Sequence, residues 1–447
     1  MRRAVVVGAS AAGLLAARIV SDVADEVVMI DRDVPPETPG LRRGVPQGFH
    51  AHNILAGGYD SIETLLPGIW DAIAKDGGAN VDIGEGLVIY WAGNRFPHSK
   101  PAGMRHAVQS RVLLEHHIRK RVEALPKVRT RYGTYARGLD IADGRVRGVR
   151  LGREGEAIEQ IPADIVILAT GRSGRVLKWF HEHGYPSPPI HSIPVRLGYA
   201  SRLYRGTPSV NANTPILACY GTRERTTRHG VALRIETGET LFTIMGYDRD
   251  FPPTEPEAFE AWTETLETRD IAMNIRAAEP TSKVHGFRVH DQYRRDWHKI
   301  SLPEGVAVVG DAVCGLDPVF GQGISAHATQ AMAVYETVQR RGFQSQAVQR
   351  AANRAILTPW LINSLEIARY PTIAPHVPLP PMVLKMARPL LDRIYSACPN
   401  STEVYHEFLK IMTMKQGPYL SPANFLRVLR NAASGRVSAK GAPGEAG

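Results

Sequence analysis

The sequence predicts an α/β fold that carries a β-rich insert and a helical C-terminal region. Apolar runs typical of buried strands in a parallel sheet occur at 4–7, within the predicted strand 26–31, where Glu26 and Asp31 flank four apolar residues, and at 165–168 and 306–309. A small-residue turn and a helical stretch at 14–20 separate the first two runs, as in a β-α-β unit. Because the four runs lie far apart in the chain, the domain that contains this sheet must be discontinuous.

The segment between the predicted strands has a different pattern. Val195–Ala200 alternates like a half-exposed antiparallel strand, Thr240–Met245 is rich in β-formers, and Glu255–Thr268 is helical in pattern. After residue 346, prolines punctuate helical segments, and the last residues are rich in Gly, Ala and Ser. We therefore expect a Rossmann-like domain at 1–180 and 286–345, a substrate-binding insert at 181–285, a helical region at 346–434 and a disordered tail at 435–447.

Composition excludes several classes of protein. The 447 residues are 43% hydrophobic and 22% charged, which excludes a disordered or collagen-like chain. No apolar run is long enough for a transmembrane helix. The net charge is +10, but the basic residues are scattered, which disfavours nucleic-acid binding. Three isolated cysteines, Cys219, Cys314 and Cys398, indicate a reducing compartment, so we expect a cytoplasmic protein.

The first motif with chemical meaning is the turn Gly8–Gly13, followed by Asp31 at the end of the next strand. This spacing fits a dinucleotide-binding fingerprint, in which the acidic residue binds ribose hydroxyls. The middle glycine of the fingerprint is replaced by Ser10. The start of the following helix still offers free N–H groups to phosphates. The alternative is an ordinary β-α-β turn without a ligand.

A second motif follows the last predicted strand. Gly310 and Asp311 end that strand, and the glycine-rich stretch Pro318–Ser325 opens a long helix. A carboxylate at a strand end can accept a sugar hydroxyl, and a glycine-rich turn presents bare N–H groups to an anion or a ring carbonyl. The alternative is a purely structural connection between strand and helix.

Together with Gln109-Ser110-Arg111, these motifs make the chain resemble the FAD-dependent monooxygenases of the aromatic-hydroxylase and squalene-epoxidase type. Arg42–His52, Ile167–Arg172 and the helical region from Trp360 to Arg430 are similar to the bacterial polyether (polyene) epoxidase branch. The resemblance implies that FAD is held by Gly8, Ser10, Ala11, Ala12, Gly13, Asp31, Arg32, Arg43, Arg111, Gly310, Asp311, Pro318, Gly321, Gln322, Gly323 and Ile324.

The resemblance also implies a reaction. A flavin C4a-hydroperoxide would deliver one oxygen atom from O2 to an electron-rich π bond. An isolated olefin needs no enzymatic base, whereas a phenol does, and the sequence offers no unambiguous base; the candidates are Asp317, Gln47 and His50. We therefore expect epoxidation of a hydrophobic polyketide or prenyl-type substrate. An aromatic hydroxylase, a flavin-dependent reductase of prenyl double bonds and a binding protein with a structural nucleotide are alternatives.

Two departures from the pattern affect these expectations. Ala169-Thr170-Gly171 stands where related single-component hydroxylases carry an Asp-Gly pair, so electrons are expected from a separate flavin reductase rather than directly from NAD(P)H. Asp317 replaces the asparagine of the epoxidase branch, and it either acts on the substrate or caps the next helix. His50 and His52 lack carboxylates at metal-ligand spacing, so no metal site is predicted.

Overall fold

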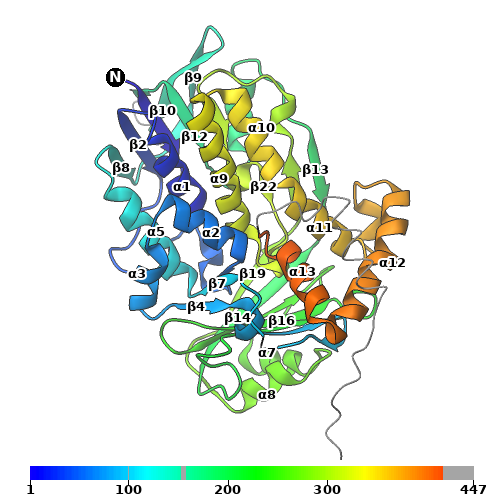
Figure 1. Ribbon diagram of the computed structural model, residues 1–447. Helices are drawn as coiled ribbons and strands as arrows, with labels where there is room; N and C mark the ends of the chain where they lie inside the picture. Colours follow the sequence, from blue (N-terminus) through cyan, green and yellow to red (C-terminus); the bar gives the residue numbers. More distant parts are fainter. Residues whose placement is uncertain (99, 153–157, 416–447) are drawn as a thin grey trace, which may run out of the picture.

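The computed structural model describes residues 1–98, 100–152 and 158–415. Part of the predicted helical region, 416–434, and the predicted tail, 435–447, lie outside the described residues. The layers of the molecule are a parallel sheet with helices on one face, a larger mixed sheet at one end, and a group of C-terminal helices beside both (Figure 1). This is the predicted fold class.

The first layer is a five-stranded parallel sheet in the order β21-β12-β1-β2-β8. Its strands are β1 (Arg3–Val7), β2 (Glu26–Asp31), β8 (Val128–Tyr132), β12 (Ile165–Leu168) and β21 (Val306–Val308). The four predicted apolar runs therefore form neighbouring strands, although β21 lies more than a hundred residues after β12. The long connections between strands carry the other layers.

Apolar side chains on both faces explain why these strands lack alternation. Val6, Met29 and Ile167 point to a helical layer, whereas Val5, Val28 and Val166 point to the opposite side of the sheet. The helical layer contains α1 (Ala11–Val20), α5 (Arg111–Glu123), α9 (Gly323–Arg341) and α10 (Ser345–Ala355) (Figure 1). The opposite face is covered by an antiparallel sheet of β9 (Ala136–Ala142), β10 (Arg145–Leu151) and β11 (Glu159–Pro162).

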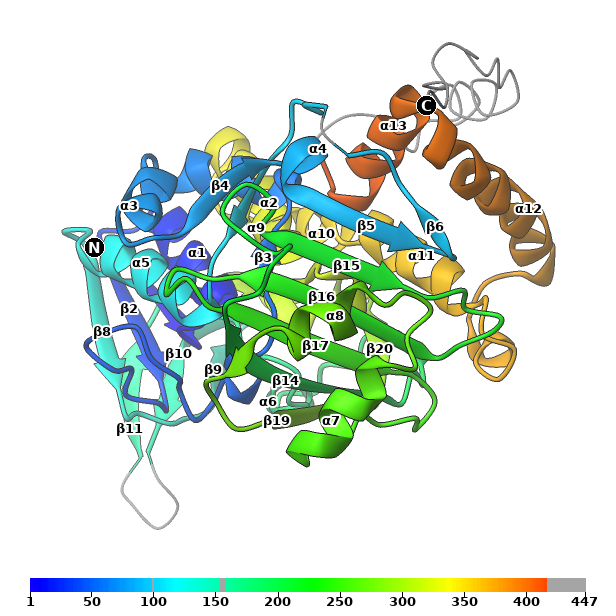
Figure 2. The same ribbon diagram turned by 90° about the horizontal axis from the view of Figure 1, so that it is seen from below.

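The second large layer is an eight-stranded sheet (Figure 2). Its strands are β5 (Leu87–Trp91), β6 (Asn94–Arg95), β14 (Leu197–Arg205), β15 (Ile216–Tyr220), β16 (Arg228–Arg234), β17 (Thr240–Gly246), β18 (Glu279–Pro280) and β19 (His285–Val289). Two of them, β5 and β6, come from within 1–180, so this sheet draws on more of the chain than the expected insert. The boundaries 181–285 remain a prediction.

One face of the eight-stranded sheet packs on α7 (Pro256–Thr263) and α8 (Asp270–Arg276). Ala200, Ala232, Phe242 and Ile244 belong to that core. The opposite face turns toward the parallel sheet. As a result every residue of β17 is buried, and the first half of β14 is buried too. The expectation of a half-exposed strand at Val195–Ala200 was therefore wrong, because both faces of the sheet are covered. The single helix expected at 255–268 is instead α7, which ends at Thr263, followed by α8.

The C-terminal layer contains α11 (Leu357–Ile367), α12 (Pro381–Ala397) and α13 (Thr402–Met412) (Figure 1). The remaining helices are α2 (Ala56–Leu65), α3 (Ile69–Lys75), α4 (Ile83–Gly86) and α6 (Arg175–His181), with 3-10 turns at 46–49, 297–299, 310–312, 318–320, 374–376 and 398–400. Two three-stranded sheets join the layers: β3 (Asn53–Ile54), β4 (Ala79–Asp82) and β7 (Arg105–Val108), and β13 (Ile190–Ile193), β20 (Gln292–Arg295) and β22 (Cys314–Gly315).

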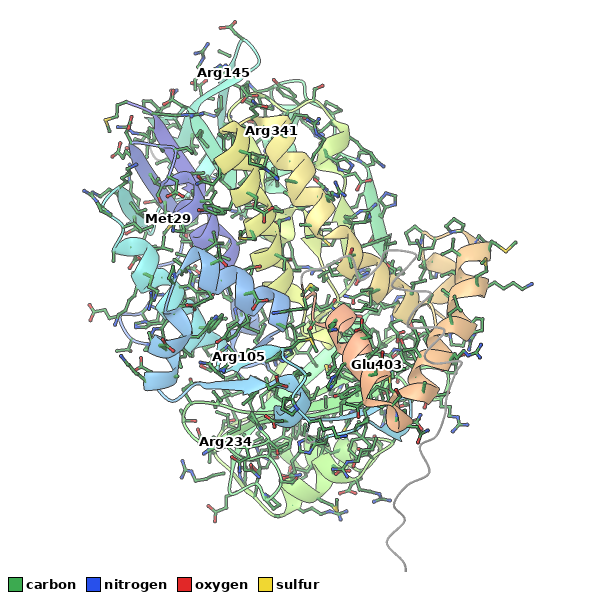
Figure 3. The ribbon with its side chains drawn as sticks, in the orientation of Figure 1. Met29, Arg105, Arg145, Arg234, Arg341 and Glu403 are labelled. Atoms are coloured by element: carbon green, nitrogen blue, oxygen red, sulfur yellow. The ribbon has the colours of Figure 1, made fainter. Side chains whose placement is uncertain are left out.

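Charged side chains lie toward both ends of the molecule (Figure 3). Arg145 and Arg341 lie toward one end of the molecule, and Arg105 and Arg234 lie toward the other (Figure 3). The three cysteines are free thiols in the interior. Within the described ranges, no helix has the length and apolar character needed to cross a bilayer.

Candidate active site

A cavity of about 450 Å³ lies between the parallel sheet and the eight-stranded sheet. Fourteen predicted site residues line it: Gly8, Ser10, Ala11, Ala12, Asp31, Arg32, Gln47, His50, Arg111, Asp311, Pro318, Gly321, Gly323 and Ile324. They come from both motifs and from the loop at 44–53. The fold therefore brings together residues that are more than three hundred positions apart in the chain.

The turn after β1 is shaped by two glycines. Gly8 has φ +105°, and a Cβ there would lie 2.3 Å from the carbonyl oxygen of Ala169. A Cβ on Gly13 would lie 1.8 Å from the carbonyl oxygen of Gly8. These approaches keep the N-terminus of α1 close to the sheet, with its first N–H groups facing the cavity. Helix α1 begins at Ala11, three residues earlier than the sequence pattern predicts, and Gly13 lies inside it rather than on the cavity wall.

The carboxylate of Asp31 faces the same turn. It accepts hydrogen bonds from the backbone N–H groups of Ala9 (2.6 Å) and Asp33 (2.8 Å). The nearest cation is Arg42, whose Nη1 lies 3.7 Å away. A carboxylate held by backbone donors at the end of β2 suits the hydroxyls of a ribose.

A buried group of charges lies beside the N-terminus of α1. Glu115 accepts from Arg42 Nη2 at 2.5 Å, and it lies 3.5 Å from Arg111 Nη2. Ser10 Oγ is 3.3 Å from both Glu115 and Arg111. Arg42 Nε and Nη1 and Arg111 Nε are buried and have no hydrogen-bond partner among the described residues. Such donors require an acceptor, and a pyrophosphate at a helix N-terminus provides one.

The position of Arg43 differs from the prediction. Arg43 is exposed and does not line the cavity, whereas Arg42 is buried and does. The loop between β2 and the 3-10 turn at 46–49 has no periodicity from which the inward residue of an Arg-Arg pair could be inferred. Glu115, also missed, lies one helical turn after Arg111 on α5, so its i,i+4 spacing was a usable signal.

The second motif contributes Asp311 to the cavity wall. His327 Nε2, on the first turns of α9, lies 3.1 Å from Asp311 Oδ1. Burial raises the pKa of Asp311, but the hydrogen bond from His327 and the charges of His327, Arg172 and Arg111 outweigh it and leave the pKa below its ordinary value. The carboxylate is therefore ionised near neutral pH. Arg172 and His327 line the cavity but were not among the predicted site residues.

Three predicted residues of this motif do not line the cavity. Gly310, with φ +68°, makes the turn before Asp311. Gln322 is buried, and its amide donates to the carbonyl of Met412 at 2.7 Å, which ties the start of α9 to α13. Asp317 is fully buried: it accepts from Val319 N at 3.0 Å and from the hydroxyl of Tyr247.

These contacts settle which interpretation of Asp317 the geometry supports. It is the N-cap of the 3-10 turn at 318–320, as in the structural alternative. Burial raises its pKa to about 6. Asp317 is not among the residues that line the cavity, although its neighbours Leu316 and Pro318 are.

The other end of the cavity is the inner face of the eight-stranded sheet. Its lining is mainly apolar or aromatic: Tyr199, Tyr220, Val231, Leu233, Met245, Phe287 and Val289. His50 lies among them and is 3% exposed, with Nδ1 2.7 Å from Ser201 Oγ. Burial, with a smaller effect of His285, lowers the pKa of His50 to about 3.

His52 connects the two ends of the cavity. Its Nδ1 lies 2.7 Å from the carbonyl oxygen of His50, and its Nε2 lies 3.3 Å from Arg111 Nη1. Because a guanidinium only donates, Nε2 accepts, and Nδ1–H donates to the carbonyl. Burial and the charge of Arg111 lower the pKa of His52 to about 3, so the ring is neutral. Across the described ranges, no cluster of three His, Cys, Asp or Glu residues could hold a metal ion.

Comparisons with known proteins agree with this architecture. No family model matches the chain. A curated relative, Protein Rv3254 of Mycobacterium tuberculosis, is 27% identical over 437 residues, which is 94% of this chain and 91% of that protein. The flavin-dependent brominase Bmp2 has a similar structure, with a TM-score of 0.67 at 14% identity over 96% of this chain and 98% of that one. The chain has an FAD-binding fold.

Two further solved structures have the same fold. PqsL of Pseudomonas aeruginosa, described as a probable FAD-dependent monooxygenase, has a TM-score of 0.62 at 15% identity, covering 84% of this chain and 97% of that one. The flavin-dependent halogenase CmlS has a TM-score of 0.64 at 16% identity, covering 97% of this chain and 78% of that one. At these identities the similarity establishes the fold, and the chemistry must be argued from the cavity.

Proposed function

We propose that the protein is an FAD-dependent monooxygenase that epoxidises an olefin of a hydrophobic polyketide or prenyl-type intermediate. The proposal rests on one observation. The same cavity is lined at one end by the glycine turns and strand-end carboxylates of the two motifs, and at the other end by the apolar face of the eight-stranded sheet. FAD, when bound, supplies the activation of O2. The residues of the chain hold the cofactor, exclude water and orient the substrate.

The cofactor end fits FAD in its chemistry. Asp31 would hold the adenosine ribose, and the N-terminus of α1 with Arg42 and Arg111 would hold the pyrophosphate. Asp311 would hold the ribityl chain, and the turn at 321–323 would present N–H groups to the flavin ring. The orphaned donors of Arg42 and Arg111 support this assignment, because they are buried without an acceptor.

The sheet end supports an apolar substrate. Val231, Leu233 and Met245 provide a surface without charge, and no lysine is among the described residues that line the cavity. An olefin needs no base, which agrees with the burial of Asp317 away from the cavity. Aromatic hydroxylation is a second candidate, because His50 places a polar ring nitrogen among these side chains, where it could meet a phenol oxygen.

Reconstitution with FAD is the first test. The full chain is mixed with FAD and desalted, and we expect retained flavin absorbance; none would refute the proposal. The loaded protein is then reduced chemically, mixed with isotopically labelled O2 and offered geraniol or 2-naphthol. Labelled epoxide indicates an epoxidase, and a labelled catechol indicates a hydroxylase. Conversion without O2 would indicate a reductase, and brominated product formed only with added bromide would indicate a halogenase.

The electron source is a separate part of the proposal. Thr170 and Gly171 line the cavity where an Asp-Gly pair is expected, and we propose that a flavin reductase delivers the electrons. Anaerobic stopped-flow mixing with NADH or NADPH should therefore show slow loss of flavin absorbance, and an added flavin reductase should restore turnover. Fast, saturable reduction by either nucleotide alone would contradict this part and leave the oxygenase proposal in place. A cytoplasmic location also remains a proposal.

A further inference from the structure

A short chain of polar groups crosses the apolar end of the cavity. His50 Nδ1 lies 2.7 Å from Ser201 Oγ, and Ser201 Oγ lies 2.6 Å from Thr243 Oγ1. Ser201 and Thr243 are paired residues of neighbouring strands β14 and β17, so their separation is fixed by the sheet. Thr243 Oγ1 also accepts from the backbone N–H of Ala51, at 3.1 Å, which ties the loop that carries His50 to the same strand pair.

The hydrogen bonds along this chain can run in two directions. If Thr243 donates to Ser201 and Ser201 donates to His50 Nδ1, then every hydroxyl proton has an acceptor. In the reverse direction Thr243 would accept from both Ser201 and Ala51, and its own proton would have no acceptor among the described residues. Each direction leaves one donor for a molecule in the cavity to pair, because both residues line it: the ring N–H at Nε2 in the first direction and the Thr243 hydroxyl in the second. The subsite proposed below has the first direction. His50 Nδ1 is then an acceptor, and the proton of the neutral ring resides on Nε2.

The surroundings keep the imidazole neutral and leave Nε2 without a protein partner in the part of the chain that the structure describes. The ring makes an edge contact with Tyr199, with ring centroids 4.4 Å apart, and lies near Phe287 at 6.1 Å. Burial is the main cause of the lowered pKa of His50, and the neighbouring His285 lowers it further. Nε2 has no partner among the described residues, and His50 lines the cavity. A neutral ring of this kind donates a hydrogen bond but does not act as a base.

We infer that His50 Nε2–H is the donor of an oxygen-binding subsite, and that the substrate is an apolar molecule carrying a carbonyl, enolate or phenolate oxygen. The apolar side chains around His50 would hold the carbon skeleton, and the Nε2–H donor would fix its orientation. This inference rests on the proposed function and narrows its substrate class: a pure hydrocarbon would leave the donor unpaired. It applies to either the epoxidase or the hydroxylase candidate.

The test compares two probes of the same ring size, 4-nitrophenol in its ionised form and nitrobenzene. Binding to the FAD-loaded full chain is measured by equilibrium dialysis. We expect the phenolate to bind at least tenfold more tightly, because a hydrogen bond to a charged oxygen contributes about tenfold to a hundredfold in affinity. His50→Leu should abolish this preference without weakening nitrobenzene. His50→Gln, which keeps an N–H at a similar reach, should retain part of it.

Ser201→Ala is the second variant, because it removes the hydroxyl that donates to His50 Nδ1 without changing the imidazole. It should reduce the preference several-fold, and it keeps the test valid if His50→Leu does not fold. Flavin retention is measured for every variant. A wild-type chain that retains no FAD would refute the proposed function itself. If flavin-loaded wild type and His50→Leu prefer ionised 4-nitrophenol over nitrobenzene to the same extent, the oxygen-binding subsite is refuted and the proposed function is not. An unchanged preference with a shifted flavin spectrum in His50→Leu would place the donor on the cofactor and overturn the inference.

Discussion

The two ends of the cavity differ in polarity, because one is lined by buried charged groups and the other is mainly apolar. At the cofactor end, Arg42 and Arg111 share the buried carboxylate of Glu115 and keep donors unpaired. At the sheet end, one neutral imidazole and two hydroxyls lie among apolar side chains. Charge at the first end suits a ligand that is always anionic, whereas a neutral donor among apolar side chains at the second end discriminates by position. The two ends can therefore be tested separately.

The largest effect is expected at the glycine turn of the cofactor end. Gly13→Ala should prevent FAD retention and lower the free energy of unfolding by about 3 kcal/mol, because the new Cβ would overlap the carbonyl oxygen of Gly8. Gly174→Ala is the matched control, since no atom lies within 4 Å of its added Cβ. Urea unfolding and flavin absorbance after desalting measure both effects. If Gly13→Ala retained FAD normally, the turn Gly8–Gly13 would not be part of the FAD-binding site.

The pH dependence of stability tests the two acidic residues of the loop between β21 and α9. The pKa of Asp317 is about 6 in the folded protein and lower in the unfolded chain. The folded state therefore binds the carboxyl proton of Asp317 more tightly than the unfolded chain does. The contribution of Asp317 to the free energy of unfolding is fully present below pH 4, and it is lost as the pH rises to about 6. The loss is about 3 kcal/mol, from the pKa difference.

Asp317→Asn should remove that dependence, so its urea midpoint should fall less than the wild-type midpoint between pH 4 and pH 6. Asp311→Asn is the control: the pKa of Asp311 is lowered, so its contribution has the opposite sign and is lost as the pH falls. Asp311→Asn should weaken FAD binding, whereas Asp317→Asn should leave it nearly unchanged. The opposite pattern would place Asp317, and not Asp311, at the cofactor.

The Arg-Arg pair gives a comparison of adjacent residues. Arg42→Ala should weaken FAD binding about tenfold to hundredfold, since it removes a charge-assisted hydrogen bond to phosphate. Arg43→Ala should change the affinity less than twofold, since Arg43 is exposed and outside the cavity. Fluorescence titration of apo-protein with FAD measures both. Equal losses would mean that the loop rearranges when the cofactor binds.

The smallest effect is expected at the sheet end. Val231→Thr keeps the shape of the side chain but adds a hydroxyl to the apolar lining, so nitrobenzene should bind about tenfold more weakly. FAD affinity should not change, because Val231 lies on β16 and contacts none of the charged groups. Equilibrium dialysis with FAD-loaded protein provides the measurement. A parallel loss of FAD affinity would show that the two ends are coupled.

The sequence predicted the parallel sheet well, because uniformly apolar strands leave a clear pattern. Both motifs also lie on the cavity, since glycines and strand-end carboxylates are recognisable at fixed spacing. The eight-stranded sheet was predicted only in part: β5 and β6 join it from a segment more than a hundred residues earlier. Local patterns carry no information about such pairing.

The individual side chains were harder to predict than the elements. The choice between Arg42 and Arg43 depends on the path of an irregular loop, and the burial of Asp317 depends on Tyr247, which directly follows the distant strand β17. His50 was a candidate from its motif, but its role needs the pairing of Ser201 with Thr243. The positions of these side chains depend on contacts between layers of the fold, and such contacts cannot be read from the sequence.

The strict alternation of β14, β16 and β17 has a consequence for the evolution of this protein. Tyr199, Val231 and Met245 face the cavity, whereas their neighbours Ala200, Ala232 and Ile244 anchor the helical core behind the sheet. Substitutions at the first set can reshape the chamber while the second set continues to hold the scaffold. A lineage could therefore exchange one substrate for another by single steps along these strands, without passing through unfolded intermediates.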